Sequence, residues 1–163
     1  MSNHTTIGNL NKALQMEMSA AHQYQLHAHV LDDWGLNLLA DKMREEQTEE
    51  IGHSDLYIER ILFLKGTPEI AFASPPKRAE TLQEMFKADL ADEEEAIDFY
   101  FKAAREANEA NDVGSRMLFE QIAIDEEAHK AWLELQLDLI NRLGEKAYSA
   151  KLVSFTQNDA ASS

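Results

Sequence analysis

Apolar residues recur at intervals of three and four positions along most of this chain, which is the period of an amphipathic α-helix. No alternating run of apolar and polar residues, the pattern of a half-buried strand, stands out. We predict helices over residues 6–34, 37–65, from 81 onward and 115–143, then a short fifth helix over about 145–153. A polar tail over 154–163 is expected to be frayed.

Residues at the predicted boundaries support these ranges. Gly35 and Gly66 follow the first two helices, where glycine commonly ends a helix. Asn37 is a plausible N-cap of the second helix. Thr81 and Glu84 form a Thr-x-x-Glu capping box, which predicts the start of the third helix.

The connections between helices predict how the helices are joined in space. The first and second helices, and the third and fourth, have short links and should form antiparallel hairpins. Residues 66–80 hold all three prolines, Pro68, Pro75 and Pro76, and can span roughly 50 Å when extended. We therefore expect an all-α four-helix bundle of about residues 6–143, with one long crossover, in a single domain over 1–163.

Length and composition restrict the class of protein. The 163 residues suit one domain with a real core, and no apolar run is long enough for a membrane span. The N-terminus lacks the basic and apolar pattern of a signal peptide, and the chain has no cysteine for disulfides or iron–sulfur clusters. We expect a cytoplasmic protein without a membrane partner.

The chain is strongly acidic, with a formal net charge of −15 and a pI near 4.7. This charge argues against nucleic-acid binding, which requires basic patches. The acidic residues form either an ordinary solvated surface or a field that concentrates cations, and charge alone does not separate these two interpretations.

Two Glu-x-x-His units lie 76 positions apart, and a single glutamate precedes each unit by 33 positions. Residues at i and i+3 lie about 60° apart around a helix, so each unit can direct a carboxylate and an imidazole to the same side. The pattern predicts four carboxylates and two imidazoles gathered from four helices: Glu17, Glu50, His53, Glu93, Glu126 and His129.

This set of side chains is the ligand set of carboxylate-bridged dinuclear sites in four-helix bundles. Three oxygens and one nitrogen for each metal, with two bridging glutamates, suit iron or manganese. Glutamate is common here, so one Glu-x-x-His unit would be unremarkable. Two units with the same upstream glutamate are far less expected by chance, and four carboxylates in a core are costly without a cation.

The 76-residue shift also relates Tyr24 to Tyr100 and Glu49 to Asp125. We predict that Asp125 accepts the free N–H of His53, a role that orients a metal-binding histidine. Glu49 can act likewise or reach another surface. Tyr24 can meet a ligand carboxylate of a neighbouring helix, or either tyrosine can simply pack in the core with a hydroxyl partner.

Three further histidines, His22, His27 and His29, lie in the first predicted helix. None has a carboxylate at ligand spacing, so we expect surface or subunit-contact histidines rather than a second metal site.

Longer stretches are specific enough to indicate a family. They are Asp33-Trp34-Gly35-Leu36, Tyr57-Ile58-Glu59-Arg60-Ile61-Leu62-Phe63-Leu64, and Asp125-Glu126-Glu127 with His129. These stretches resemble those of a bacterioferritin, and the resemblance extends from Leu10 to Tyr148. The resemblance implies a ferritin-like bundle in a homo-oligomeric 24-subunit cage that oxidises Fe(II) with O2 or H2O2 and stores Fe(III) mineral. It also implies that the six residues above form the ferroxidase centre, and that Glu46 and Glu49 bind iron facing the cavity.

One position departs from that family. Bacterioferritins commonly bind haem b through a methionine directly after the second-helix glutamate ligand, where this chain has Ile51, followed by Gly52. Isoleucine has no donor atom, and Arg44 makes the same surface more polar. Haem b is therefore not expected from this subunit alone. Some family members mix a haem-binding subunit with a ferroxidase subunit, and this chain resembles the latter.

Three functions are compatible with the pattern. The first is an iron-storage cage with ferroxidase activity. The second is a dinuclear iron or manganese oxidase or peroxidase that stores no mineral. The third is a passive helical scaffold whose site only braces the fold. The acidic composition and the short fifth helix favour the first function, and particle size separates it from the others.

Overall fold

The computed structural model describes residues 2–154, in which it contains five helices and no strand. They are α1 (Ser2–Asp33), α2 (Asn37–Phe63), α3 (Leu82–Glu109), α4 (Val113–Leu143) and α5 (Glu145–Ala150). The prediction of an all-α bundle with a short fifth helix is confirmed. The frayed tail predicted for 154–163 lies, apart from Ser154, outside the described residues.

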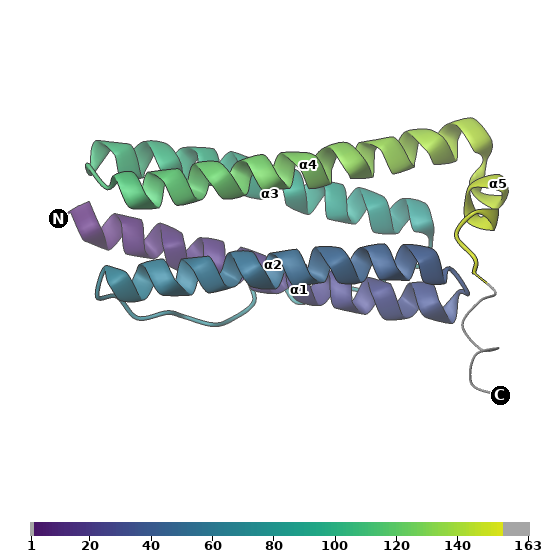
Figure 1. Ribbon diagram of the computed structural model, residues 1–163, viewed down its shortest axis with the longest axis horizontal. Helices are drawn as coiled ribbons and strands as arrows, with labels where there is room; N and C mark the ends of the chain where they lie inside the picture. Colours follow the sequence, from purple (N-terminus) through teal and green to yellow (C-terminus); the bar gives the residue numbers. More distant parts are fainter. Residues whose placement is uncertain (1, 155–163) are drawn as a thin grey trace, which may run out of the picture.

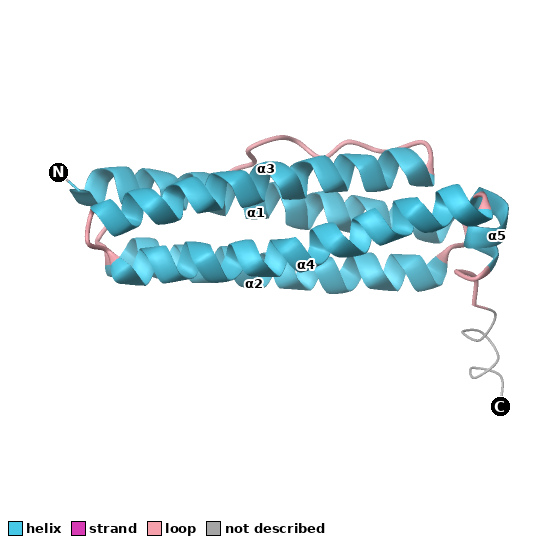
Figure 2. Cartoon of the chain, turned by 90° about the horizontal axis from the view of Figure 1, so that it is seen from above, coloured by secondary structure: helices cyan, strands magenta, loops and turns pink. Residues whose placement is uncertain are grey.

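The four long helices lie side by side, and α5 packs across one end of the bundle (Figures 1 and 2). Each hairpin is antiparallel, and the long crossover runs back along the bundle, so that α2 and α3 point the same way. Asn11, Ser19 and Gln23 on α1 hold this crossover by side-chain hydrogen bonds of 2.8–3.1 Å to the backbone of residues 67–77. The predicted crossover is therefore present.

Two boundary predictions had different outcomes. Thr81 is the N-cap of α3, and its hydroxyl accepts the N–H of Glu84 at 3.1 Å. The prediction that Asn37 caps α2 is wrong, because Leu36 occupies the cap position without a side-chain bond. The Asn37 side chain instead accepts the backbone N–H of Ser154 at 2.8 Å. This contact links the start of α2 to the segment after α5.

The remaining boundaries differ from prediction by a few residues. Helix α1 begins at Ser2 rather than at residue 6, and α5 ends at Ala150 rather than at 153. Helix α4 begins at Val113 because the Asp112 carboxylate accepts the N–H of Ser115 at 2.9 Å. A side-chain cap thus starts this helix two residues before the predicted serine.

The core consists of two apolar clusters with a polar layer between them. One cluster, which we call the α5-side core, is built around Tyr24, Leu31, Met43, Phe86, Leu133 and Tyr148. The other, the N-terminal-side core, is built around Leu10, Leu14, Tyr57, Tyr100 and Phe119. Burial of each such side chain contributes about 1.5–3 kcal/mol. Among the described residues no helix is long and apolar enough to cross a membrane.

Candidate metal centre

The predicted ligands occupy core positions of the helices. On α1, the buried residues Leu10, Leu14, Glu17, Ala21 and Tyr24 follow each other at steps of four, three, four and three. This spacing turns all five toward the bundle axis, so Glu17 points inward although it is charged. The other five predicted ligands are also buried, in the polar layer between the two apolar clusters.

The structure brings the six side chains together in two overlapping groups. In each group, one ligand atom from every residue lies within 4.8 Å of the others. We call them the His53 half-site, formed by Glu17, Glu50, His53 and Glu126, and the His129 half-site, formed by Glu50, Glu93, Glu126 and His129. Two glutamates belong to both half-sites, as expected for bridging ligands.

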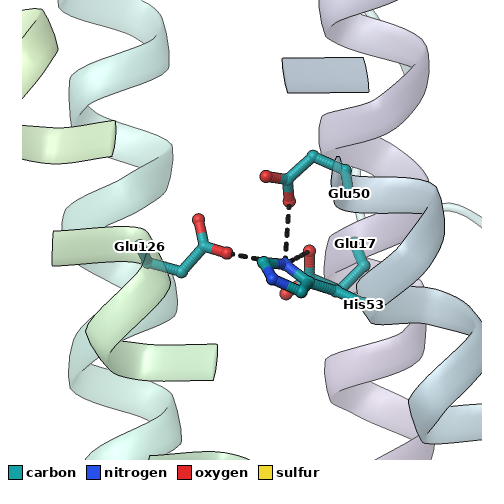
Figure 3. A group of neighbouring side chains, drawn as sticks. All are labelled: Glu17, Glu50, His53 and Glu126. Carbon is teal, nitrogen blue, oxygen red and sulfur yellow. Dashed lines mark ion pairs between the residues drawn. The ribbon is translucent and has the colours of Figure 1, made fainter. Parts of the chain in front are cut away.

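In the His53 half-site, three carboxylates surround the inner nitrogen of the imidazole (Figure 3). Nδ1 of His53 lies 2.9 Å from Glu126 Oε1, 3.4 Å from Glu17 Oε2 and 3.9 Å from Glu50 Oε2. These residues come from α1, α2 and α4, so no single helix could form the group.

The His129 half-site repeats this arrangement with the other oxygen of each shared carboxylate. Nδ1 of His129 lies 3.1 Å from Glu50 Oε1, 3.3 Å from Glu126 Oε2 and 3.6 Å from Glu93 Oε1. Glu50 and Glu126 therefore each direct one oxygen to each imidazole. Two cations in the half-sites would be joined by both carboxylates.

Two buried tyrosines contact the unshared glutamates from across the bundle. The Tyr24 hydroxyl donates to Glu93 Oε1 at 2.6 Å, and the Tyr100 hydroxyl donates to Glu17 Oε1. The predicted contact of Tyr24 with a ligand carboxylate is present, and Tyr100 makes the equivalent contact in the other half. The Tyr100 bond fixes Oε1 of Glu17 and leaves Oε2 directed to His53, whereas Oε1 of Glu93 accepts from Tyr24 and is also the oxygen that faces His129.

The outer nitrogens of the two imidazoles face acids outside the half-sites. His53 Nε2 is hydrogen-bonded to Asp125 Oδ2 at 3.1 Å, as predicted. His129 Nε2 lies 3.1 Å from Glu49 Oε2, whose side chain is half exposed, and 2.7 Å from Oε2 of the buried Glu46. Sequence reasoning missed this last contact, although Glu46 precedes Glu50 by four residues and shares its buried stripe.

Burial and neighbouring charges make the unshared carboxylates hard to ionise without a cation. Burial raises the pKa of Glu17 well above its usual 4.5, and the charges of Glu50 and Glu126 raise it further. Burial also raises the pKa of Glu93 well above 4.5, and its contact with Glu126 adds to the shift. Without a cation, these two carboxylates therefore hold protons more tightly than an exposed glutamate does.

The imidazoles also bind protons tightly in the metal-free centre. Burial lowers the pKa of His53 and His129, but the carboxylates facing each ring, Glu126 foremost, outweigh burial and raise the pKa far above 6.5. Burial raises the pKa of Glu126, yet its contacts with Glu93 and the two histidines outweigh that effect and lower it. Protons and a cation thus compete for the same donor atoms of these side chains.

Several inward-facing atoms have no hydrogen-bond partner among the described residues. They include Glu17 Oε2, Glu50 Oε1, Glu126 Oε1 and Nδ1 of both histidines. Buried polar atoms without partners are costly, and these five all face the same centre. Their oxygen-rich donor set with two nitrogens fits iron or manganese ions.

A pocket of about 470 Å³ reaches the centre from the side of the crossover. It lies between α1, α3 and the crossover, and its lining includes Lys77 and Arg78 as well as four ligand carboxylates, Glu17, Glu50, Glu93 and Glu126. His27 also lines this pocket, but its side chain is buried, and Nδ1 lies 3.2 Å from Asp89 Oδ2. The expectation of a surface or subunit-contact histidine is therefore wrong for His27.

Comparisons with known proteins agree with this geometry. Residues 7–143 match the family described as ferritin-like domain. The chain is 40% identical to the bacterioferritin of Rhodobacter capsulatus over 152 residues, 93% of each chain. It is also 40% identical to the bacterioferritin of Brucella melitensis biotype 1 over 142 residues, which are 87% of this chain and 88% of that protein.

Solved structures of such proteins superpose closely on the fold. The R. capsulatus bacterioferritin, solved with a metal-free dinuclear site and a haem iron, has a TM-score of 0.90 and 38% identity, covering 93% of this chain and 95% of that one. The bacterioferritin BfrA of Mycobacterium tuberculosis has a TM-score of 0.89 at 38% identity, covering 91% and 94%.

Proposed function

This chain belongs to the bacterioferritin family of ferritin-like proteins, and from that premise we propose that it oxidises Fe(II) to Fe(III) at the dinuclear centre and stores the product as mineral inside an oligomeric cage. Iron storage of this kind also removes reactive Fe(II). The six predicted residues, Glu17, Glu50, His53, Glu93, Glu126 and His129, would bind the iron.

The observation that carries the proposal is the sharing of Glu50 and Glu126 between two half-sites. Each of these carboxylates directs one oxygen to His53 and the other to His129. Two Fe(II) ions held in this way are adjacent and can together supply two electrons. A scaffold would gain nothing from burying four carboxylates around one centre without a cation.

The overall reaction balances with two electrons and two protons. Two Fe(II), O2 and two protons yield two Fe(III) and H2O2; with H2O2 as oxidant, two Fe(II) and two protons yield two Fe(III) and two H2O. The protons displaced from Glu17, Glu93 and the histidines when iron binds are available for this step. The protein supplies the binding and the proximity of the two iron ions.

Entry and exit routes have different linings. The pocket beside the crossover reaches Glu17 and Glu93 and offers a path for a small oxidant. On the other side of His129, the carboxylates of Glu46 and Glu49 form a third acidic group with its outer nitrogen. We assign these two glutamates to iron transfer toward the cavity, so Glu49→Ala should slow mineral growth more than the first oxidation.

The cage is tested by size. A cage of 24 copies of this 18.5 kDa chain would have a mass of about 440 kDa. Light scattering after chromatography, followed by iron counts on loaded particles, measures both the assembly and the storage. A small oligomer that oxidises iron without retaining it would instead support the non-storage oxidase or peroxidase.

The ferroxidase activity is tested by stopped-flow absorption. The wild-type protein should oxidise two Fe(II) per subunit in a fast phase. Glu17→Ala and Glu93→Ala should each lose that phase, because each removes a ligand from one half-site, while the assembly stays intact. Fast phases of wild-type rate in both variants would refute the assignment.

Haem b does not fit the residues of this chain. Ile51, where the family commonly has a methionine, is partly exposed and offers no donor atom, and a Cβ at Gly52 would meet no atom within 4 Å. The purified homo-oligomer should lack a Soret band of haem with two sulfur ligands, and Ile51→Met should restore part of the binding. Binding of one haem per two unmodified subunits would show that this chain binds haem b by itself. Haem that binds only after co-expression with a methionine-bearing subunit would support a mixed cage.

A further inference from the structure

The buried carboxylate of Glu46 has two different partners, one on each oxygen. Its Oε2 lies 2.7 Å from Nε2 of His129, the nitrogen that faces away from the dinuclear centre. Its Oε1 forms an ion pair with the ammonium of Lys42, one turn earlier on α2. Only 4% of Glu46 is exposed, so water can screen or solvate this carboxylate very little.

Lys42 lies at the rim of the polar layer between α2 and α4. Its Nζ is 5.4 Å from the centre of the Trp132 ring, within the range of a cation–π contact. The Lys42 side chain is about one-third exposed (32%), and its second carboxylate neighbour, the exposed Glu45, is farther away at 3.8 Å. The ammonium can therefore stay partly hydrated while it neutralises Glu46.

Among the described residues, the His53 half-site has no such ion pair. A shift of 76 residues relates Lys42 to Leu118 and Glu46 to Ile122, and both counterparts pack in the N-terminal-side core. The outer nitrogen of His53 is bonded instead to Asp125, whose second oxygen accepts a hydrogen bond from the neutral amide of Gln121 at 3.1 Å. Both imidazoles therefore face a carboxylate, but the partner of that carboxylate is a cation for His129 and a neutral amide for His53.

We infer that Lys42 is a positioning residue, whose ammonium holds Glu46 against His129 and so strengthens metal binding in the His129 half-site only. The inference rests on the proposed di-iron function. An acceptor on the outer nitrogen fixes the tautomer and the ring orientation of a metal-binding histidine and makes it a better donor. Without Lys42, Glu46 would be a buried charge whose cationic partner is gone, and it would turn toward solvent and away from His129.

Stepwise Co(II) binding tests the inference, because Co(II) can occupy the same ligands without being oxidised by air as Fe(II) is. Wild-type protein should bind two Co(II) per subunit, as measured by absorption and calorimetry. In Lys42→Met, one of the two affinities should fall by about tenfold and the other should stay unchanged. The matched control is Lys130→Met: Lys130 is 35% exposed and pairs with the outer carboxylates Glu94 and Glu134, at 3.3 and 3.8 Å.

Two further variants separate the charge of Lys42 from its packing. Lys42→Arg keeps the charge and should restore most of the lost affinity. In a Glu46→Gln background, Lys42→Met should cause no additional loss, because the lysine acts through Glu46. Unchanged affinities in Lys42→Met, an equal loss in Lys130→Met, an arginine variant that behaves like methionine, or a full second loss in the Glu46→Gln background would each overturn the inference. Wild-type protein that binds fewer than two Co(II) would instead contradict the proposed function.

Discussion

The two helical hairpins of this bundle agree closely in what faces the centre and differ in what surrounds it. A shift of 76 residues relates four residues of the α1–α2 hairpin to residues of the same type in the α3–α4 hairpin. They are Glu17 and Glu93, Tyr24 and Tyr100, Glu50 and Glu126, and His53 and His129. Each tyrosine also donates to the unshared glutamate of the opposite hairpin. The residues that touch the centre thus keep the same chemistry in both hairpins.

Several residues one layer farther from the centre do not keep the same chemistry. Glu46 of α2 corresponds to the buried Ile122 of α4, and the buried pair of His27 and Asp89 corresponds to Ala103 and Ala13. A cation requires a particular set of donors, so the inner positions are constrained alike in both halves. The outer positions only have to pack or pair, so the two half-sites can have different affinities.

The largest effect is expected when a carboxylate shared by both half-sites is removed. Glu126→Ala takes one oxygen from each half-site, so we expect both Co(II) affinities to fall by more than about 100-fold. Loss of a residue that only contacts a ligand from outside costs about 100-fold at most. Isothermal titration measures both steps. Glu127→Ala is the control, because the neighbouring Glu127 is exposed and belongs to neither half-site. Retention of one tight Co(II) in Glu126→Ala would show that this carboxylate does not bridge.

A smaller effect should come from the unshared glutamates, which belong to one hairpin each. Glu17→Ala should weaken the His53 half-site and Glu93→Ala the His129 half-site, so each variant should retain about one tightly bound Co(II) per subunit. Absorption of bound Co(II) gives the stoichiometry. If either variant lost both ions, the half-sites would be more strongly coupled than the two shared carboxylates require.

The pH dependence of the metal-free protein tests whether protons occupy the centre. The folded pKa values of Glu17 and Glu93 lie above 4.5, and those of His53 and His129 lie above 6.5. A group whose pKa is raised by folding stabilises fully below its unfolded pKa, and this contribution disappears as pH rises through the folded pKa. We therefore expect the melting temperature of metal-free protein to fall between about pH 5 and pH 9.

Bound metal should remove most of this pH dependence. The cation replaces the protons and needs ionised carboxylates and neutral imidazoles, so Co(II) should raise the melting temperature more at about pH 8 than at about pH 6. The lowered pKa of Glu126 acts in the opposite sense, but only at pH values below its usual 4.5. Calorimetric scans with and without Co(II) measure both curves. An equal gain at the two pH values would contradict the exchange of protons for metal.

The smallest expected effects concern the outer acids that correspond in the two hairpins. Asp125→Asn should weaken the His53 half-site by about tenfold at most, since Asp125 is the acid bonded to the outer nitrogen of His53. Glu49→Gln should change the His129 half-site by no more than about twofold, because Glu49 is half exposed and Glu46 also faces that nitrogen. Stepwise Co(II) titration ranks the two variants, and the reverse order would contradict the difference between the hairpins.

Much of the fold and the inner site could be predicted because both depend on spacing along single helices. The helical period decides which residues face inward, so Glu50 and His53 must point to the same side wherever the helix lies. The internal repeat adds that a second helix presents the same pair. The proline-containing link is long enough to make α2 and α3 parallel, which brings Glu50 and Glu93 to similar heights.

Other contacts across helices, outside this inner set, were decided by the tertiary structure alone. The burial of His27 against Asp89, the contact of Glu46 with His129 and the bond of Asn37 to Ser154 join residues 62, 83 and 117 positions apart. None of these pairs repeats at a helical period. They depend on how far the helices slide and rotate against each other, and this follows from the packing of both apolar clusters as a whole. The sequence therefore determined the inner donors and the contact of Asp125 with His53, while the packed bundle decided that Glu46 faces His129 from outside.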